Sequence, residues 1–81
     1  MIAELKSQWI ELISKYCNDQ TIIASLWLDI SKHYSSKKRY YHNFTHIQNM
    51  LLLAKDFEND IEDYDTLLFS IWYHDIVYKS T

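Results

Sequence analysis

Apolar residues recur every three or four positions through most of the chain, a spacing that places them on one face of an α-helix. The first such stripe covers residues 2–16, and a second continues to residue 34 after a polar break. In that break, Asp19 or Thr21 can cap the second helix by accepting its free amide protons. The inward-facing residues expected here are Ile2, Leu5, Trp9, Leu12, Ile13, Tyr16, Ile23, Leu26, Trp27, Ile30 and Tyr34.

A third stripe, at residues 47–57, repeats the pattern in the second half of the chain. It predicts a helix for which Asn43 or Thr45 is the expected N-cap residue, because both side chains can accept a hydrogen bond from a free amide. The apolar face of this helix comprises Ile47, Met50, Leu51, Ala54 and Phe57.

An acidic segment separates the third helix from the fourth. Residues 56–65 hold six carboxylates and no basic residue, and they lack the glycine and the alternating ligands of a calcium loop. A solvated turn is therefore expected, with Asp63 or Asp65 capping a fourth helix over residues 64–78. The core candidates of this helix are Leu67, Leu68, Ile71, Trp72 and Val77.

The composition fits one all-α domain over residues 1–81. The chain contains neither glycine nor proline, where average usage would give about ten such residues. β-Hairpin turns and glycine-rich phosphate loops thus lack their usual residues. A hydrophobic content of 48% excludes a disordered chain. The expected architecture is a small array of about four helices, arranged as two antiparallel hairpins.

Charge, cysteine content and hydropathy narrow the setting of the protein. A net charge of −3 argues against general nucleic-acid binding, which requires a basic surface. Cys17 is the only cysteine, so no internal disulfide can form and a reducing compartment is indicated. No stretch approaches the ~20 apolar residues of a membrane helix, and no signal peptide opens the chain. A cytoplasmic location without a membrane partner is expected.

Two clusters of residues are not explained by apolar packing. The first holds His42 and His46 at the start of the third helix, and the second places His74 beside Asp75 in an aromatic and aliphatic run. A short turn centred near Ile61 joins the third and fourth helices, so they should pack antiparallel. His46 and His74 lie almost equally far from that turn, which leaves an axial offset of about 3 Å. The two clusters are therefore expected to meet.

A metal ion is the simplest partner for such a cluster. Packed helix axes lie about 8–10 Å apart, a gap that two inward-reaching imidazoles can bridge through a shared ion. Asp75 lies about 100° around its helix from His74, close enough to bind the same ion. A metal ion also removes the cost of burying unpaired polar groups. This mixed nitrogen and oxygen set suits Mn, Fe, Co, Ni or Zn rather than a metal that prefers thiolates.

The residues of both clusters carry a resemblance to a known family. The two motifs read Tyr41-His42-Asn43-Phe44-Thr45-His46-Ile47 and Ile71-Trp72-Tyr73-His74-Asp75-Ile76-Val77-Tyr78. They resemble the HD-domain superfamily of metal-dependent phosphohydrolases, and within it a group of small bacterial predicted phosphohydrolases. The likeness covers about half of the chain, residues 39–78. It implies a partial HD-domain fold in which His46 is the first metal ligand and His74 and Asp75 form the His-Asp pair.

The same resemblance implies further roles. The His-Asn-x-x-His element is similar to one in cyclic nucleotide phosphodiesterases, and by that analogy His42 protonates the leaving oxygen. An alternative alignment makes His42 the metal ligand and leaves His46 as support. Arg39 is the expected phosphate-binding residue, because a guanidinium group forms paired hydrogen bonds with phosphate. The implied cofactor is a divalent ion (Mn, Fe, Co, Ni, Zn or Mg), and the implied substrate is a phosphate ester or nucleotide.

The chain departs from the family pattern at its end. Members of the superfamily use a further aspartate on a later helix, whereas only Lys79, Ser80 and Thr81 follow the second motif here. We therefore expect the front part of an HD-type domain, truncated before that ligand and weakly active. Two alternatives stay open. One is a non-catalytic interaction module or homo-oligomer, suggested by three Trp and seven Tyr in a short chain. The other is an inactive gene remnant.

Overall fold

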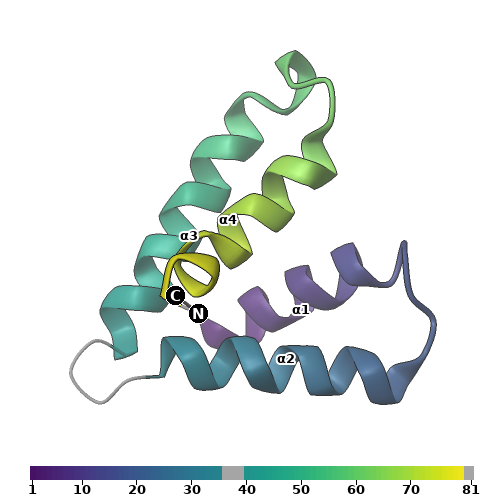
Figure 1. Cartoon of the computed structure of the whole chain (residues 1–81). Coiled ribbons are helices and arrows are strands. Elements are labelled where there is room, and N and C mark those ends of the chain that lie inside the picture. Colours follow the sequence, from purple (N-terminus) through teal and green to yellow (C-terminus); the bar gives the residue numbers. More distant parts are fainter. Residues whose placement is uncertain (36–39, 80–81) are drawn as a thin grey trace.

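The computed structural model confirms the all-α prediction (Figure 1). It describes the backbone of residues 1–35 and 40–79, and the side chains of residues 1–35, 44–74 and 76. The described residues form four α-helices and a single 3₁₀ turn, and they contain no strand. The elements are α1 (Ile2–Ile13), α2 (Gln20–Tyr34), α3 (Tyr40–Asp56), η1 (Glu58–Asp60) and α4 (Tyr64–Lys79).

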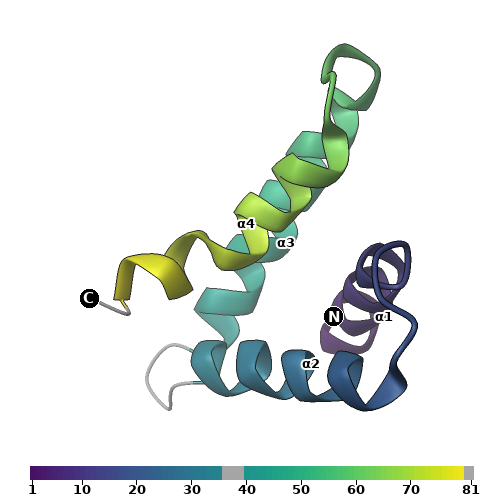
Figure 2. The ribbon, with the colours of Figure 1, turned by 45° about the vertical axis from the view of Figure 1, so that its right-hand side comes forward.

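The helices are arranged as two hairpins. In both views α3 and α4 lie side by side, whereas α1 packs against α2 (Figures 1 and 2). The second hairpin packs against α2, which contacts both α3 and α4 (Figure 1). Figure 2 also shows that the C-terminal part of α4 turns away from the line of its first part. None of the helices in the described part of the chain has both the length and the apolar character required to cross a bilayer.

Aspartate caps fix the starts of two helices, as the sequence predicts. The Asp19 carboxylate accepts hydrogen bonds from the backbone N–H groups of Thr21 and Ile22, at 3.0 and 3.2 Å. The Asp63 carboxylate accepts one from the N–H of Thr66 at 3.1 Å. Each carboxylate satisfies amides that have no partner within the helix itself. The two aspartates therefore determine where α2 and α4 begin.

The start of α3 differs from the prediction. The helix begins at Tyr40, so Asn43 and Thr45 lie within it and do not cap it. The physical reason is Phe44, which is fully buried and extends the apolar stripe by one turn beyond Ile47. Tertiary packing of that extra turn outweighs the local preference of Asn and Thr for a cap position.

Two aromatic residues expected in the core lie at the surface instead. α1 ends at Ile13, and the following Tyr16 is 63% exposed. Its ring still touches Phe69, and its hydroxyl donates a hydrogen bond to the Asp65 carboxylate at the surface. Phe57 is 52% exposed because α3 ends one residue before it. In both cases the helix ends before the last aromatic residue of its apolar pattern, so that residue does not lie on the helix face that packs in the core.

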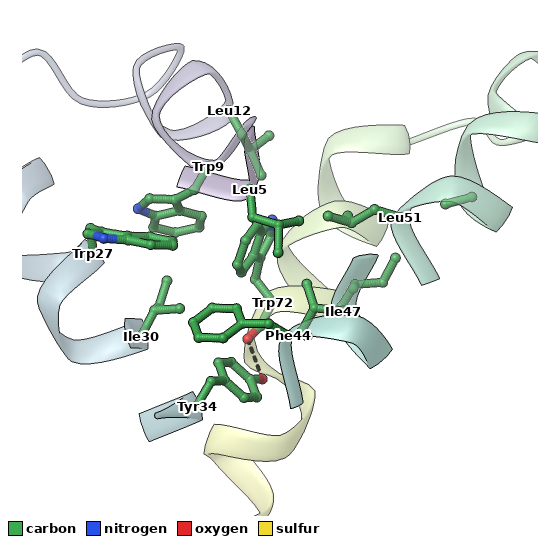
Figure 3. Packing of buried hydrophobic residues seen from close by; sticks show 12 residues of the cluster. Leu5, Trp9, Leu12, Trp27, Ile30, Tyr34, Phe44, Ile47, Leu51 and Trp72 are labelled. Atoms are coloured by element: carbon green, nitrogen blue, oxygen red, sulfur yellow. Dashed lines mark hydrogen bonds between the residues drawn. The ribbon is translucent and has the colours of Figure 1, made fainter. Parts of the chain in front are cut away.

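The core is built around tryptophan (Figure 3). The Trp9 side chain is fully buried, and its ring lies 5.6–5.9 Å from the rings of Phe69, Trp72 and Tyr73 in edge-on contacts. Such pairs are favourable because the edge of one ring meets the electron-rich face of another. The cluster of buried residues comprises Leu5, Trp9, Leu12, Trp27, Ile30, Tyr34, Phe44, Ile47, Leu51, Ala54, Ile71 and Trp72. All three tryptophans are thus buried within this small domain.

Candidate functional site

The rings of His46 and His74 lie together across the α3–α4 hairpin. Their centroids are 5.7 Å apart, with 67° between the ring planes. His46 comes from α3 and His74 from α4, and both side chains are exposed to solvent. Antiparallel packing around the acidic turn brings the two positions to the same level, which confirms the spacing argument made from the sequence. The distance leaves the two imidazoles close enough to share one small ligand.

The His74 ring is fixed by its own helix. Its Nδ1 atom lies 2.7 Å from the carbonyl oxygen of Ile71, one turn earlier in α4. A carbonyl oxygen can only accept a hydrogen bond, so Nδ1 must carry the proton. In the neutral imidazole the lone pair then resides on Nε2. Histidine ligands of metal ions commonly have this arrangement, in which a backbone carbonyl sets the tautomer and the ring orientation.

The two histidines stand at the edge of the core rather than inside it. Phe44 and Ile47 flank His46 in the sequence and are fully buried, so α3 is held firmly at this level. Ile71 and Trp72 hold α4 in the same way ahead of His74. Rigid apolar residues thus support an accessible polar pair. This combination favours a binding site, because well-packed neighbours hold ligand groups in place.

Tyr73 lies next to His74 but is unsuited to act as a base. Its side chain is half-buried, and this burial, with a smaller contribution from the charge of Asp29, raises the pKa of its hydroxyl above the usual value. The phenol is therefore neutral at physiological pH. Its ring contributes packing against Trp9.

The other predicted site residues are not tested by this structure. Arg39 lies outside the described residues, as do the side chains of His42 and Asp75. Backbone geometry places His42 in the first turn of α3 and Asp75 in α4. Among the described side chains, no group of three or more His, Cys, Asp or Glu residues could hold a metal ion. The described part of the site therefore consists of two imidazoles.

A second polar cluster, which the sequence did not reveal, joins the turn after α1 to the start of α4. The Asp65 carboxylate lies 2.6 Å from the Tyr16 hydroxyl, which donates to it, and 3.2 Å from the Lys15 ammonium. The hydrogen bond from Tyr16 and then that from Lys15 lower the pKa of Asp65. The same bond to Asp65 raises the pKa of Tyr16. These partners are about fifty positions apart, so no local pattern reveals them.

A groove of about 400 Å³ lies between α1 and the second hairpin. Its lining combines apolar residues with amides and charges of both signs. It comprises Leu5, Gln8, Glu11, Leu12, Lys15, Gln48, Leu51, Leu52, Lys55, Glu58, Tyr64, Asp65, Leu68 and Trp72. Neither His46 nor His74 belongs to this lining, so the groove and the histidine pair are separate features. The sequence gives no sign of the groove, because its lining brings together residues of the first and second hairpins that are far apart in the chain.

Comparison of the chain with models of known protein families, with curated proteins and with solved structures found no match. The assignment of function therefore depends on the two motifs and on the geometry of the histidine pair.

Proposed function

We propose that this chain is a metal-dependent phosphohydrolase domain of the HD type, in which His46 and His74 bind a divalent cation together with Asp75. The observation that carries the proposal is the 5.7 Å approach of the two rings, with the His74 tautomer set by the Ile71 carbonyl. Two imidazoles held this way offer nitrogen lone pairs to one ion, and a neighbouring carboxylate would supply negative charge.

In this proposal each residue has a separate task on a phosphate ester or nucleotide. A bound cation would supply polarisation of the phosphoryl group. Arg39 would hold the phosphate through paired hydrogen bonds from its guanidinium group. His42, one helical turn before His46, would donate a proton to the leaving oxygen, a task that suits an imidazole titrating near neutral pH. Two imidazoles and one carboxylate leave an ion exposed and weakly bound, so we expect metal binding with slow turnover.

Metal titration tests the proposal directly. Isothermal titration with Ni²⁺ or Co²⁺ should give one site in the wild-type chain, and His46→Ala or His74→Ala should weaken binding at least tenfold. Glu11→Gln is the control, since Glu11 is an exposed potential metal ligand on α1 rather than on either site helix. Absence of binding by the wild type, or unchanged binding after His74→Ala, would overturn the proposal.

Activity gives a second test of the same proposal. Hydrolysis of p-nitrophenyl phosphate by the metal-loaded chain should be detectable and should disappear in His74→Ala. We expect rates far below those of typical enzymes, which are roughly 1–10³ s⁻¹. A rate inside that range would refute the expectation of a weakly active form.

One observation favours a non-catalytic interaction module as a second candidate. The end of α3 exposes the apolar side chains of Leu52 and Leu53, and Phe57 just beyond it is exposed as well. All three tryptophans are buried, so within the aromatic content that suggested this alternative only tyrosine, such as the exposed Tyr16, still supports it. An interaction module should associate in light scattering, and its stability should not change with EDTA. A monomer whose stability falls with EDTA would exclude it.

A further inference from the structure

Tyr34 contacts both helices that carry the histidine pair. It is the last residue of α2, and only 2% of its side chain is exposed. Its hydroxyl donates a buried hydrogen bond of 2.8 Å to the backbone carbonyl of Trp72 in α4 (Figure 3). Its ring lies 6.0 Å from the ring of Phe44 in α3. One side chain from the first hairpin thus reaches both helices of the second.

Each of these two contacts lies two residues before a histidine in the sequence, and because α3 and α4 run antiparallel the contacts lie on opposite sides of the histidine pair along the hairpin. Trp72 precedes His74 by two residues, and Phe44 precedes His46 by two residues. A shift of either helix along its axis would therefore move a histidine and a Tyr34 contact together. Tyr34 is in a position to set the relative level of the two imidazoles.

The hydrogen bond gives this contact a direction that apolar packing lacks. Trp27 also touches Phe44 and Trp72, at ring distances of 6.5 and 6.0 Å. Apolar contact alone tolerates small slides, because dispersion attraction and burial depend weakly on direction. A buried hydroxyl, in contrast, must keep its acceptor within hydrogen-bond distance, since leaving it unpaired is unfavourable. The carbonyl of Trp72 is consequently held at one height relative to α2.

The backbone of α4 shows a related feature at this level. The adjacent carbonyls of Ile71 and Trp72 each meet a side chain, one from His74 and the other from Tyr34. Side chains that bond helix carbonyls bend a helix by competing with its own amides. The chain has no proline, and Figure 2 shows that the C-terminal part of α4 turns. The Tyr34 bond therefore meets the backbone of α4 directly beside the carbonyl that holds the His74 ring.

We propose that Tyr34 is a positioning residue for the histidine pair: its hydroxyl on the Trp72 carbonyl and its ring on Phe44 set the separation of the His46 and His74 rings. The geometric part of this inference concerns the protein without a ligand. Its consequence for metal affinity rests on the proposed function.

The test replaces Tyr34 with phenylalanine, which keeps the ring and removes only the hydroxyl. NMR of the metal-free chain reports the approach of the two imidazoles through the NOE between their ring protons, and Ni²⁺ titration reports affinity. We expect Tyr34→Phe to lose at least half of that NOE intensity and to bind Ni²⁺ at least fivefold more weakly. Phe44→Leu, which removes the ring contact from the other side, should change both readouts in the same direction.

Ile30→Val is the matched control. Ile30 is fully buried one turn earlier in α2. Shortening its side chain lowers stability but leaves the hydrogen bond between Tyr34 and Trp72 in place. This control should keep the wild-type NOE and the wild-type affinity. A Tyr34→Phe chain with an unchanged NOE would overturn the positioning role. A wild-type chain that shows the NOE and binds no metal would refute the proposed function and leave the positioning role standing.

Discussion

The buried indole of Trp9 provides the sharpest test of how the core is held together. Trp9 is completely buried and makes three edge-on ring contacts. Its Nε1–H group has no hydrogen-bond partner among the described residues. Replacing Trp9 with alanine removes the ring contacts and leaves a cavity, a change that typically costs about 3–5 kcal/mol. The ring contacts alone account for roughly 0.5–1.5 kcal/mol each.

Trp9→Phe should be much milder than Trp9→Ala. Phenylalanine retains part of the packing, and it removes a buried donor whose desolvation costs about 1–3 kcal/mol when no partner is present. We therefore expect a loss below about 2 kcal/mol. The whole domain is expected to have only about 4–12 kcal/mol of stability, from roughly 0.05–0.15 kcal/mol per residue. Trp9→Ala should consequently remove a large share of this stability, whereas Trp9→Phe should keep most of it.

Urea denaturation followed by far-UV circular dichroism measures both changes, provided that the dependence on urea stays constant. Leu28→Ala is the control, because Leu28 is exposed on α2 and should change stability by no more than about 0.5 kcal/mol. The reasoning is refuted if Trp9→Phe loses as much stability as Trp9→Ala, or if Trp9→Ala loses less than about 1 kcal/mol.

Four further predictions follow from the cap of α2, from the cluster around Asp65 and from the histidine pair. Asp19→Ala should destabilise the protein by about 1 kcal/mol in urea titrations, because two amides of α2 lose their acceptor; an unchanged midpoint would contradict the cap. The lowered pKa of Asp65 means that its stabilising effect is present above its unfolded pKa and is lost as pH falls through the folded pKa. The urea midpoint should therefore fall less steeply with decreasing pH in Asp65→Asn than in the wild type. An identical dependence on pH would count against the cluster. The raised pKa of Tyr16 has the opposite sense, so its contribution is present below its unfolded pKa and is lost as pH rises through the folded pKa; Tyr16→Phe should remove this alkaline loss. Finally, Ni²⁺ at a hundredfold excess over its dissociation constant should stabilise the wild type by about 2.7 kcal/mol, reversibly with EDTA. The same addition should leave the melting curve of His74→Ala unchanged, and equal stabilisation of both chains would place the metal elsewhere.

Features set by local spacing were predictable from the sequence. The helices, the hairpin connections and the caps at Asp19 and Asp63 follow from periodicity and from side-chain oxygens next to free amides. The level of His46 and His74 was also predictable, because helical rise is constant and both count from the same turn.

Features that depend on tertiary contact were not predictable. The early start of α3 depends on the burial of Phe44 in the core cluster, and the hydrogen bond from Tyr34 to Trp72 joins residues 38 positions apart. The bond from His74 to the Ile71 carbonyl required the side-chain conformation, although the three-residue spacing allows it. Periodicity defines which face of a helix is apolar, but it does not determine which partner each residue meets on that face.

The bond between His74 and the Ile71 carbonyl has a consequence for any ligand that reaches this histidine. An exposed imidazole normally rotates about two bonds, and a ligand must arrest that motion, at a cost of about 0.5–1.5 kcal/mol for each side chain that it immobilises. Here the bond to the Ile71 carbonyl already holds the ring, and in the neutral imidazole it leaves the free lone pair on Nε2. The readiness of His74 to bind is thus a property of the folded helix itself, established before any ligand arrives.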